Sequence, residues 1–342
     1  MHNADRAVLR IGTGITLTTL ICYGLALPMP HLGLIMAWVV LCQPGEPVGL
    51  KKGLAGAALL LGIIASGVLL VPLLTHYALA AVLLVTLLLY LLMQQAMAGK
   101  GAPAILLIIA ITVIPVAGLI EQALAISLAK MMATGVLVGM LVNGIAYRLF
   151  PPTTTAGATA KPAQVRPEHP ERLALRAVAI VIPVWLLALS NPAFYIPAVM
   201  KTVTLGQQST ALNAKEAGRT LVLSTLAGAL LAFALWFGLA IWPSLLMLML
   251  LLTLMTLWLA RRLLRLVASR FPPSFWSNAW ITALILFGPA IEDSATGKDV
   301  WLAAAMRCGL YLLVAGYGWF CILLLEQWWP AGRPLEETQL GE

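Results

Sequence analysis

The stretch GRTLVLSTLAGALLAFALWFGLAI (Gly218 to Ile241) carries a single charged residue, Arg219, close to its start. About 20 residues of this kind form a helix long enough to cross the hydrocarbon core of a bilayer. Similar blocks recur along all 342 residues, of which 61% are hydrophobic and only 10% are charged. A soluble domain carries about 25% charged residues, so this chain has too little charge to cover a water-facing surface. The sequence predicts an all-α polytopic membrane protein.

The apolar blocks predict about twelve transmembrane helices, six on each side of a polar segment. That segment, PPTTTAGATAKPAQVRPEHPE, is rich in Pro, Thr and Ala, which is typical of a linker. We expect a first six-helix unit over residues 1–150, a cytoplasmic linker over 151–171, a second six-helix unit over 172–330 and a cytoplasmic tail over 331–342. The expected spans are 9–27, 32–46, 53–73, 77–96, 102–120, 123–147, 173–190, 193–208, 218–241, 244–265, 275–291 and 300–328.

Basic residues gather at alternate connections between the expected spans. Most of the 21 Lys and Arg residues, including Arg6, Arg172 and Arg262, fall on one side, whereas Glu121 and Asp299 fall on the other. Because basic loops face the cytoplasm, we expect both termini to lie in the cytoplasm. The chain would then cross the inner membrane of the cell an even number of times. The net charge of +8 is then explained by the membrane topology and does not indicate a nucleic-acid partner.

The two halves resemble each other at three anchor points. DRAVLR (Asp5 to Arg10) matches ERLALR (Glu171 to Arg176), LCQPG matches LGQQS, and LKKG matches AKEA, all at nearly the same offset along the chain. Each half holds an even number of expected spans and starts in the cytoplasm. The pattern therefore predicts a parallel repeat, with the halves related by an axis along the membrane normal.

In both halves the second expected span is unusually short. The first copy ends at QPGEP, which begins with Gln43, and the second contains Pro197 and the segment GQQST, which includes Gln207. Short or broken membrane helices at matched positions are typical of transport sites, because irregular backbone survives at membrane depth only where it lines a cavity or is buried in protein. The alternative is that both helices simply end early at a cytoplasmic turn.

Three cations lie within apolar blocks. Lys130 and Arg307 sit at equivalent depth, roughly 10 Å from the outer ends of their helices at 1.5 Å per residue, and Lys201 lies nearer mid-membrane in the short eighth span. Such residues usually face a bundle interior or an aqueous cavity, and we expect no intramembrane carboxylate to match them. The three cations thus predict a binding site for an anionic substrate. The alternative for Lys130 and Arg307 is snorkelling toward the lipid headgroups.

A second group of cations lies at the cytoplasmic ends of the third and ninth spans. Lys215 and Arg219 are four residues apart and share one helix face, and Lys51 occupies the corresponding place in the first half. These residues could line the cytoplasmic mouth of an anion path, or they could serve only as topological anchors.

Small residues indicate helix packing, and nothing indicates an enzyme. GVLVG (Gly135 to Gly139) and GYG (Gly316 to Gly318) predict close contacts of the sixth and twelfth spans. The four cysteines are scattered in apolar blocks without a CxxC pair, which is typical of packing residues. We expect no catalytic residue, no metal site and no cofactor.

The chain resembles the fusaric-acid-resistance and aromatic-acid-exporter family. The similarity lies in six spans per half, in the basic openings LRIGTG and LRAVAI, and in the basic entries GLKKGLAG and AKEAGRTL to the third span of each half. The resemblance implies an inner-membrane permease that exports aromatic or other organic acids and commonly works with a periplasmic membrane-fusion adaptor. Two departures are the short linker, where larger members carry soluble regions, and Ala55, which stands where the first copy would repeat Arg219.

Two other functions are compatible with the same sequence. A passive organic-anion channel needs no titratable intramembrane carboxylate, and the acidic residues here lie near the ends of the expected spans. A non-transporting membrane subunit that scaffolds the cell envelope would fit if the matched cations face lipid.

Overall fold

The computed structural model describes residues 3–43, 62, 65–97, 101–151, 170–208, 214–295, 297 and 299–328. Over these residues the regular secondary structure is entirely helical. Gln43, the first residue of the QPGEP segment, is described. Outside the described residues lie the rest of that segment, Lys51 and most of the expected linker and tail. The helices are α1 (Asn3–Gly24), α2 (Pro30–Leu41), Ala65–His76, α4 (Ala78–Met97), α5 (Gly101–Ile120), α6 (Gln122–Leu149), α7 (Pro170–Ser190), α8 (Pro192–Gln208), α9 (Ala214–Ile241), α10 (Leu245–Leu263), α11 (Pro273–Ala295) and α12 (Val300–Trp328).

The described helices confirm an all-α polytopic membrane protein. Eight of them are long and apolar enough to cross a bilayer, and three further apolar helices are shorter. One of these short helices is α2, with 12 residues, which agrees with the short second span expected from the sequence. In contrast, α8 runs unbroken through Pro197 to Gln208, so the expectation that Pro197 interrupts this helix is wrong. A proline removes only one backbone hydrogen bond, and here the helix continues past it.

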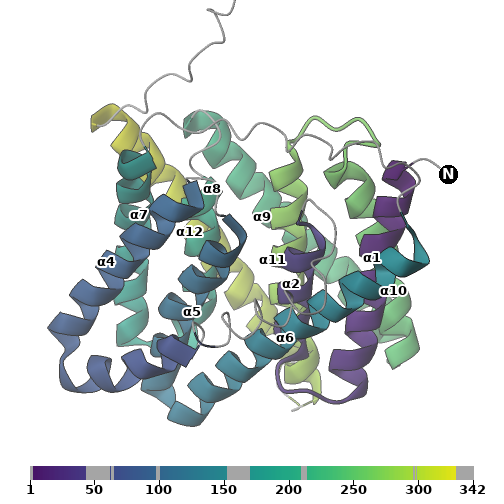
Figure 1. Cartoon of the computed structure of the whole chain (residues 1–342), viewed down its shortest axis with the longest axis horizontal. Coiled ribbons are helices and arrows are strands. Elements are labelled where there is room, and N and C mark those ends of the chain that lie inside the picture. Colours follow the sequence, from purple (N-terminus) through teal and green to yellow (C-terminus); the bar gives the residue numbers. More distant parts are fainter. Residues whose placement is uncertain are drawn as a thin grey trace, which may run out of the picture.

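The helices pack side by side, and α11 lies between helices of the two halves of the chain (Figure 1). This helix contacts α2 from the first half of the chain and α8, α9, α10 and α12 from the second. Trp38 of α2 is a main link to α11, because its indole Nε1 donates to the Ser277 hydroxyl at 3.2 Å and its ring meets Trp280 edge-on at 6.3 Å. The two halves therefore share one buried core.

Glycines allow the closest helix contacts, as the sequence predicted for the sixth span. A Cβ on Gly135 would lie 2.8 Å from Cα of Gly33, and one on Gly139 would lie 2.9 Å from Cα of Ala37. These contacts bring α2 and α6 together along one seam. For the twelfth span the prediction is wrong at Gly316, where no atom lies within 4 Å of an added Cβ.

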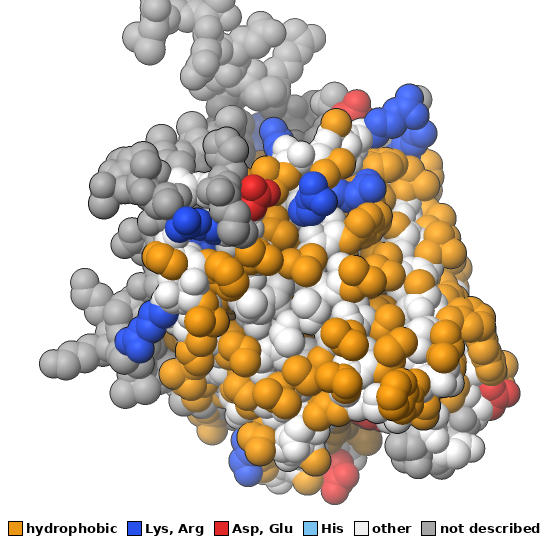
Figure 2. All heavy atoms as spheres, turned by 90° about the vertical axis from the view of Figure 1, so that its right-hand side faces the viewer, with side chains coloured by type: hydrophobic (Ala, Val, Ile, Leu, Met, Phe, Trp, Pro, Cys, Tyr) orange, Lys and Arg blue, Asp and Glu red, His pale blue; other side chains and the backbone are white. Residues whose placement is uncertain are grey.

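The outer surface of the bundle is apolar between two polar ends. On α10, Leu246, Leu250 and Leu254 are 63%, 59% and 65% exposed and recur every four residues, so they line one helix face. Figure 2 shows hydrophobic side chains covering this side of the molecule, with Lys and Arg concentrated at one end. An exposed apolar belt of this kind is suited to contact with lipid tails.

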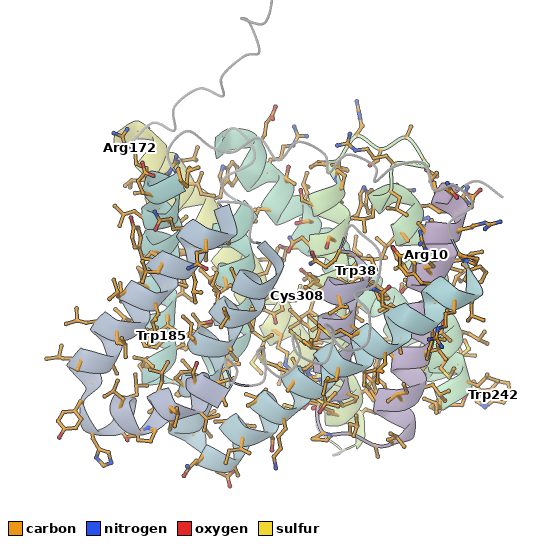
Figure 3. All side chains as sticks on the ribbon, in the orientation of Figure 1. Arg10, Trp38, Arg172, Trp185, Trp242 and Cys308 are labelled. Atoms are coloured by element: carbon orange, nitrogen blue, oxygen red, sulfur yellow. The ribbon has the colours of Figure 1, made fainter. Side chains whose placement is uncertain are left out.

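One end of the bundle is basic, and we call it the basic end. It holds the start of α1 and the start of α7, where Figure 3 places Arg10 and Arg172, whereas Trp242 lies toward the other end. Two contacts tie the end of α6 to the start of α1: Arg6 Nη1 donates to the Pro151 carbonyl at 2.6 Å, and the Arg10 guanidinium lies 4.1 Å from the centre of the Tyr147 ring. The starts of α1 and α7 therefore lie at the same end.

Candidate functional site

Lys201 is buried in the helix bundle at 2% exposure. Its Nζ donates to Thr282 Oγ1 at 2.8 Å and to Asn278 Oδ1 at 3.2 Å, both on α11. Neither acceptor carries a charge, so these two contacts solvate the ammonium without neutralising it. Asn278 and Thr282 are four residues apart and therefore point from the same face of α11 toward α8.

The Lys201 site extends to α9 through Asn278. The Asn278 side chain accepts from Lys201 through Oδ1 and donates from Nδ2 to the Ser224 hydroxyl at 2.5 Å. Ser224 in turn donates to the Leu221 carbonyl at 2.9 Å, and Thr282 donates to the Asn278 carbonyl at 2.7 Å. Lys201, Ser224, Asn278 and Thr282 are each at most 2% exposed, and we call them the Lys201 cluster.

A glycine brings α9 close enough to α11 for this cluster to form. A Cβ on Gly228 would lie 2.6 Å from the Ala279 carbonyl oxygen and 2.7 Å from Cβ of Thr282. Ser224 lies one turn before Gly228 on the same helix face. The close approach at Gly228 therefore positions Ser224 beside Asn278.

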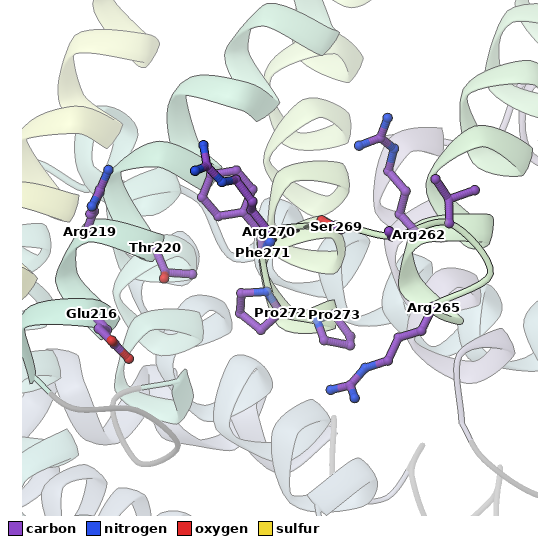
Figure 4. Close-up of a pocket in the computed structure, with 12 residues that line it drawn as sticks. Glu216, Arg219, Thr220, Arg262, Arg265, Ser269, Arg270, Phe271, Pro272 and Pro273 are labelled. Carbon is purple, nitrogen blue, oxygen red and sulfur yellow. Dashed lines mark hydrogen bonds between the residues drawn. The ribbon is translucent and has the colours of Figure 1, made fainter.

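At the basic end, the start of α9 and the loop between α10 and α11 line an open cavity of about 870 Å³ (Figure 4). In Figure 4, Arg219 and Thr220 of α9 lie on one side, Arg262 and Arg265 on the other, and Ser269 and Arg270 between them. Of the described residues that line it, Glu216 is the one that is acidic. We call this space the arginine cavity.

The arginine cavity and the Lys201 cluster are built on the same two helices. Thr220 of α9 and Pro273 of α11 line the cavity, and Ser224 and Asn278 follow them along these helices. At 1.5 Å per residue these separations correspond to roughly 6 Å and 7.5 Å along the helix axes. The cluster therefore begins about one to two helical turns deeper in the bundle than the cavity.

Arg307 has a carboxylate partner, which corrects the expectation that the intramembrane cations are unmatched. Its Nη1 lies 2.7 Å from Asp293 Oδ2, and the two side chains are 26% and 10% exposed. The expected eleventh span ended at residue 291, whereas α11 continues to Ala295. Asp293 therefore lies on the helix, facing α12, and not in a loop at the membrane surface.

A histidine–carboxylate contact lies beside this ion pair at the same end of α11. His31 Nδ1 is 3.2 Å from Glu292 Oε1, and Gly288 makes room for this histidine, because a Cβ there would overlap the His31 side chain. Together the two contacts join α11 to α2 and to α12 at the end opposite to the arginine cavity.

The other described residues that were proposed from the sequence lie on or beside α2, α6, α8 and α9. Lys130 lies on an exposed position of α6, and Gln43 is exposed at the end of α2, where its Nε2 donates to the Val39 carbonyl at 3.1 Å. Pro197 and Gln207 lie within α8 and Lys215 lies in the first turn of α9. Of the expected cytoplasmic mouth, Arg219 lines the arginine cavity.

Sequence reasoning missed the polar partners of Lys201 and three of the four arginines of the cavity. Ser224, Asn278 and Thr282 are uncharged residues inside expected spans, and Asn278 is the strongest available signal because an amide is costly in a membrane helix without a partner. Arg262, Arg265 and Arg270 looked like topological anchors. Among the described residues, no three His, Cys, Asp or Glu side chains gather as metal ligands would.

No family model, curated protein or solved structure matches this chain.

Proposed function

We propose that this protein is a membrane permease that exports organic anions, with aromatic or other acidic compounds as its substrates. The observation that carries this proposal is the position of Lys201, an ammonium buried among neutral oxygens of α11. A cation at the centre of a membrane helix costs about 2.5–3.5 kcal/mol, and such residues mark substrate or ion pathways. A carboxylate that reaches Lys201 would form a charge-assisted hydrogen bond in dry surroundings.

The arginine cavity supports entry from the basic end. Four guanidinium groups against one carboxylate attract anions from solution. The cavity and the Lys201 cluster follow each other along α9 and α11, so these two helices would form the wall of the path. Arg219 then has the role of a residue at the cytoplasmic mouth, together with Lys51 and Lys215.

We further propose that the chain consists of two parallel six-helix repeats with twelve spans. In such a repeat each helix of the first half corresponds to the helix six positions later, so that α1 corresponds to α7 and α4 to α10. The contacts between the halves then occur in matched pairs. The contact of α1 with α10 matches that of α7 with α4, and the contact of α2 with α11 matches that of α8 with α5. The glycine contacts match as well. A Cβ on Gly67 would lie 2.9 Å from the Ala110 carbonyl oxygen, and one on Gly228 would lie 2.6 Å from the Ala279 carbonyl oxygen.

The distribution of charge supports a bacterial inner-membrane location with the basic end in the cytoplasm. The starts of α1 and α7 lie at that end, so the proposed topology has both termini in the cytoplasm. These features agree with a member of the aromatic-acid-exporter family, and the proposed partner is a periplasmic membrane-fusion adaptor that contacts the opposite end.

A passive organic-anion channel is the second candidate. It is favoured by the contacts of the two carboxylates on α11, because Glu292 lies against His31 and Asp293 pairs with Arg307. A proton-driven exporter would need carboxylates that can gain and lose protons during the cycle.

The test compares the wild-type chain, Lys201→Met and Lys130→Met in cells that lack other aromatic-acid exporters. The readout is accumulation of a panel of radiolabelled aromatic acids, with benzoate as the simplest member, at matched membrane expression. We expect the wild type to lower accumulation, Lys201→Met to abolish this effect and Lys130→Met to retain it. Unchanged export in Lys201→Met would show that the cation serves packing and would exclude the proposed site.

Dissipating the proton gradient distinguishes the exporter from the channel, because only a channel would keep moving anions down their own gradient.

A further inference from the structure

The arginine cavity carries more positive charge than a monocarboxylate needs. Among the described residues that line it are four arginines and one glutamate, a formal excess of three positive charges within this set. Guanidinium groups present a planar fork of donors that matches carboxylate and phosphate oxygens. A cavity of about 870 Å³ falls in the range of small-molecule binding sites.

Arg262 is fixed in place before any ligand binds. Its guanidinium lies 4.3 Å from the centre of the Trp258 ring and 4.6 Å from that of Trp276, so it is held by two aromatic rings. Trp276 is itself fixed, because its Nε1 donates to the Ser269 hydroxyl at 3.0 Å. This arrangement restrains a long side chain that would otherwise lose rotamer freedom on binding.

Arg265 occupies a backbone position that normally selects glycine. Its φ is 57°, in the left-handed region that side chains with a Cβ disfavour. The surrounding hydrogen bonds, Arg265 N to the Arg262 carbonyl and Leu266 N to the Arg261 carbonyl, form the Schellman ending in which glycine is the usual residue. An arginine at this place strains the backbone and puts its side chain on the wall of the cavity (Figure 4).

In a bilayer the apolar stripe of α10 would place the cavity near the lipid headgroups. The cavity follows directly on the exposed apolar stripe of α10, which ends at Trp258, a residue type enriched at the membrane interface. Leu266 and Val267, in the loop beside the cavity, are each 36% exposed. Basic pockets between membrane helices at the cytoplasmic side are suited to anionic headgroups.

We propose that the arginine cavity is a binding site for a phosphate-bearing anion with two or more negative charges, separate from the monocarboxylate position at Lys201. Arg262 provides a fixed donor, and Arg219, Arg265 and Arg270 complete the charge from α9 and the loop. The phosphate belongs either to the headgroup of an anionic phospholipid or to a soluble compound, and both present the same oxygens to the arginines. This site does not depend on the proposed export activity.

The test uses the full-length protein in a neutral detergent and measures binding of cardiolipin, with phosphatidylcholine as the neutral lipid and inorganic pyrophosphate as the soluble probe. The decisive variant is Arg265→Gly, which removes the charge and also relieves the backbone strain. Arg172→Gln is the matched control, because it removes one exposed arginine of the basic end that does not line the cavity.

We expect Arg265→Gly to keep or raise the melting temperature without ligand and to weaken cardiolipin binding at least ten-fold, with Arg172→Gln within two-fold of the wild type. Pyrophosphate binding with the same response to Arg265→Gly, and no response to cardiolipin, would support the site and assign it to a soluble phosphate. Equal losses in Arg265→Gly and Arg172→Gln would mean that the basic end attracts anions without a defined site, and would overturn the proposal. Absence of binding for both probes would overturn it as well.

Discussion

Lys201 and Arg307 are both cations in membrane helices, yet the structure treats them differently. Arg307 lies 2.7 Å from the carboxylate of Asp293 on the neighbouring helix. The Lys201 ammonium is instead held by the amide oxygen of Asn278 and the hydroxyl of Thr282. The first arrangement pairs a cation with an anion, whereas the two contacts of Lys201 are hydrogen bonds to neutral oxygens.

The difference separates a structural cation from one suited to bind a ligand. The pair Arg307–Asp293 joins α12 to α11, and a buried pair of this kind holds its two helices together as long as both charges remain. In the Lys201 cluster the ammonium donates to Asn278 and Thr282. A substrate carboxylate could accept a hydrogen bond in addition to these two acceptors or in place of one of them. Four variants, taken from the largest expected effect to the smallest, test this contrast.

Arg307→Met should be the most damaging change, because it leaves Asp293 in the bundle without its cation. Breaking a buried ion pair from one side costs 3–5 kcal/mol, and partial exposure of Arg307 places the expected loss at about 3 kcal/mol. Thermal unfolding in detergent measures the effect. The double variant Arg307→Met/Asp293→Asn should recover most of the stability, and failure to do so would mean that the pair is not what joins the helices.

Asn278→Leu should be the next most damaging, and it tests whether neutral oxygens hold Lys201. The change removes the acceptor at 3.2 Å from Lys201 and the donor at 2.5 Å from Ser224. Hydrogen bonds to charged groups contribute about 1.5–3 kcal/mol each, so we expect a loss of about 2 kcal/mol in the free energy of unfolding. Adding Lys201→Met should restore stability, because no buried ammonium then lacks its acceptor. A double variant as unstable as Asn278→Leu alone would contradict the proposed contact.

The positions of the helices follow from the sequence, because hydropathy and charge fix where a segment enters and leaves the membrane. The expected span 77–96 corresponds to α4 (Ala78–Met97), and 173–190 to α7 (Pro170–Ser190). Lys201 is buried in the bundle, which is where a cation within a membrane span usually lies. These are one-dimensional properties that each segment carries alone.

The partners of the cations do not follow from the sequence, because they depend on how each helix is rotated against its neighbours. Asn278 and Ser224 are far from Lys201 along the chain, and only the close contact at Gly228 brings them together. The sequence places Asp293 just past the end of an apolar block and thus at the edge of the membrane, whereas α11 continues one turn further. Apolar periodicity could not resolve either case, since these helices are apolar on most faces.

Gly228→Ala should weaken the Lys201 cluster by moving α9 away from α11. The added Cβ would lie 2.6 Å from the Ala279 carbonyl oxygen, and because this atom belongs to the backbone the helices must separate. Overpacking costs about 1–3 kcal/mol, and the better helix propensity of alanine returns up to about 1 kcal/mol, so we expect a net loss of about 1 kcal/mol. Gly316→Ala is the matched control, because its Cβ meets no atom within 4 Å, and it should be neutral or stabilising. A stabilising Gly228→Ala would show that α9 and α11 are less closely packed than described.

Lys130→Met should have the smallest effect, because Lys130 lies at an exposed position of α6, unlike the buried Lys201 and the paired Arg307. Its ammonium can reach the headgroup region along its own aliphatic stem, so its removal neither strands a partner nor opens a cavity. Substitutions at exposed positions usually change stability by less than about 0.5 kcal/mol, and the same range is expected in thermal unfolding here. The variant should also export the labelled aromatic acids as the wild type does. A loss of export in Lys130→Met at normal stability would place this cation on the substrate path. The comparison of Lys201 with Arg307 would then need a third kind of intramembrane cation, one that is exposed at the surface of the bundle and still contacts the substrate.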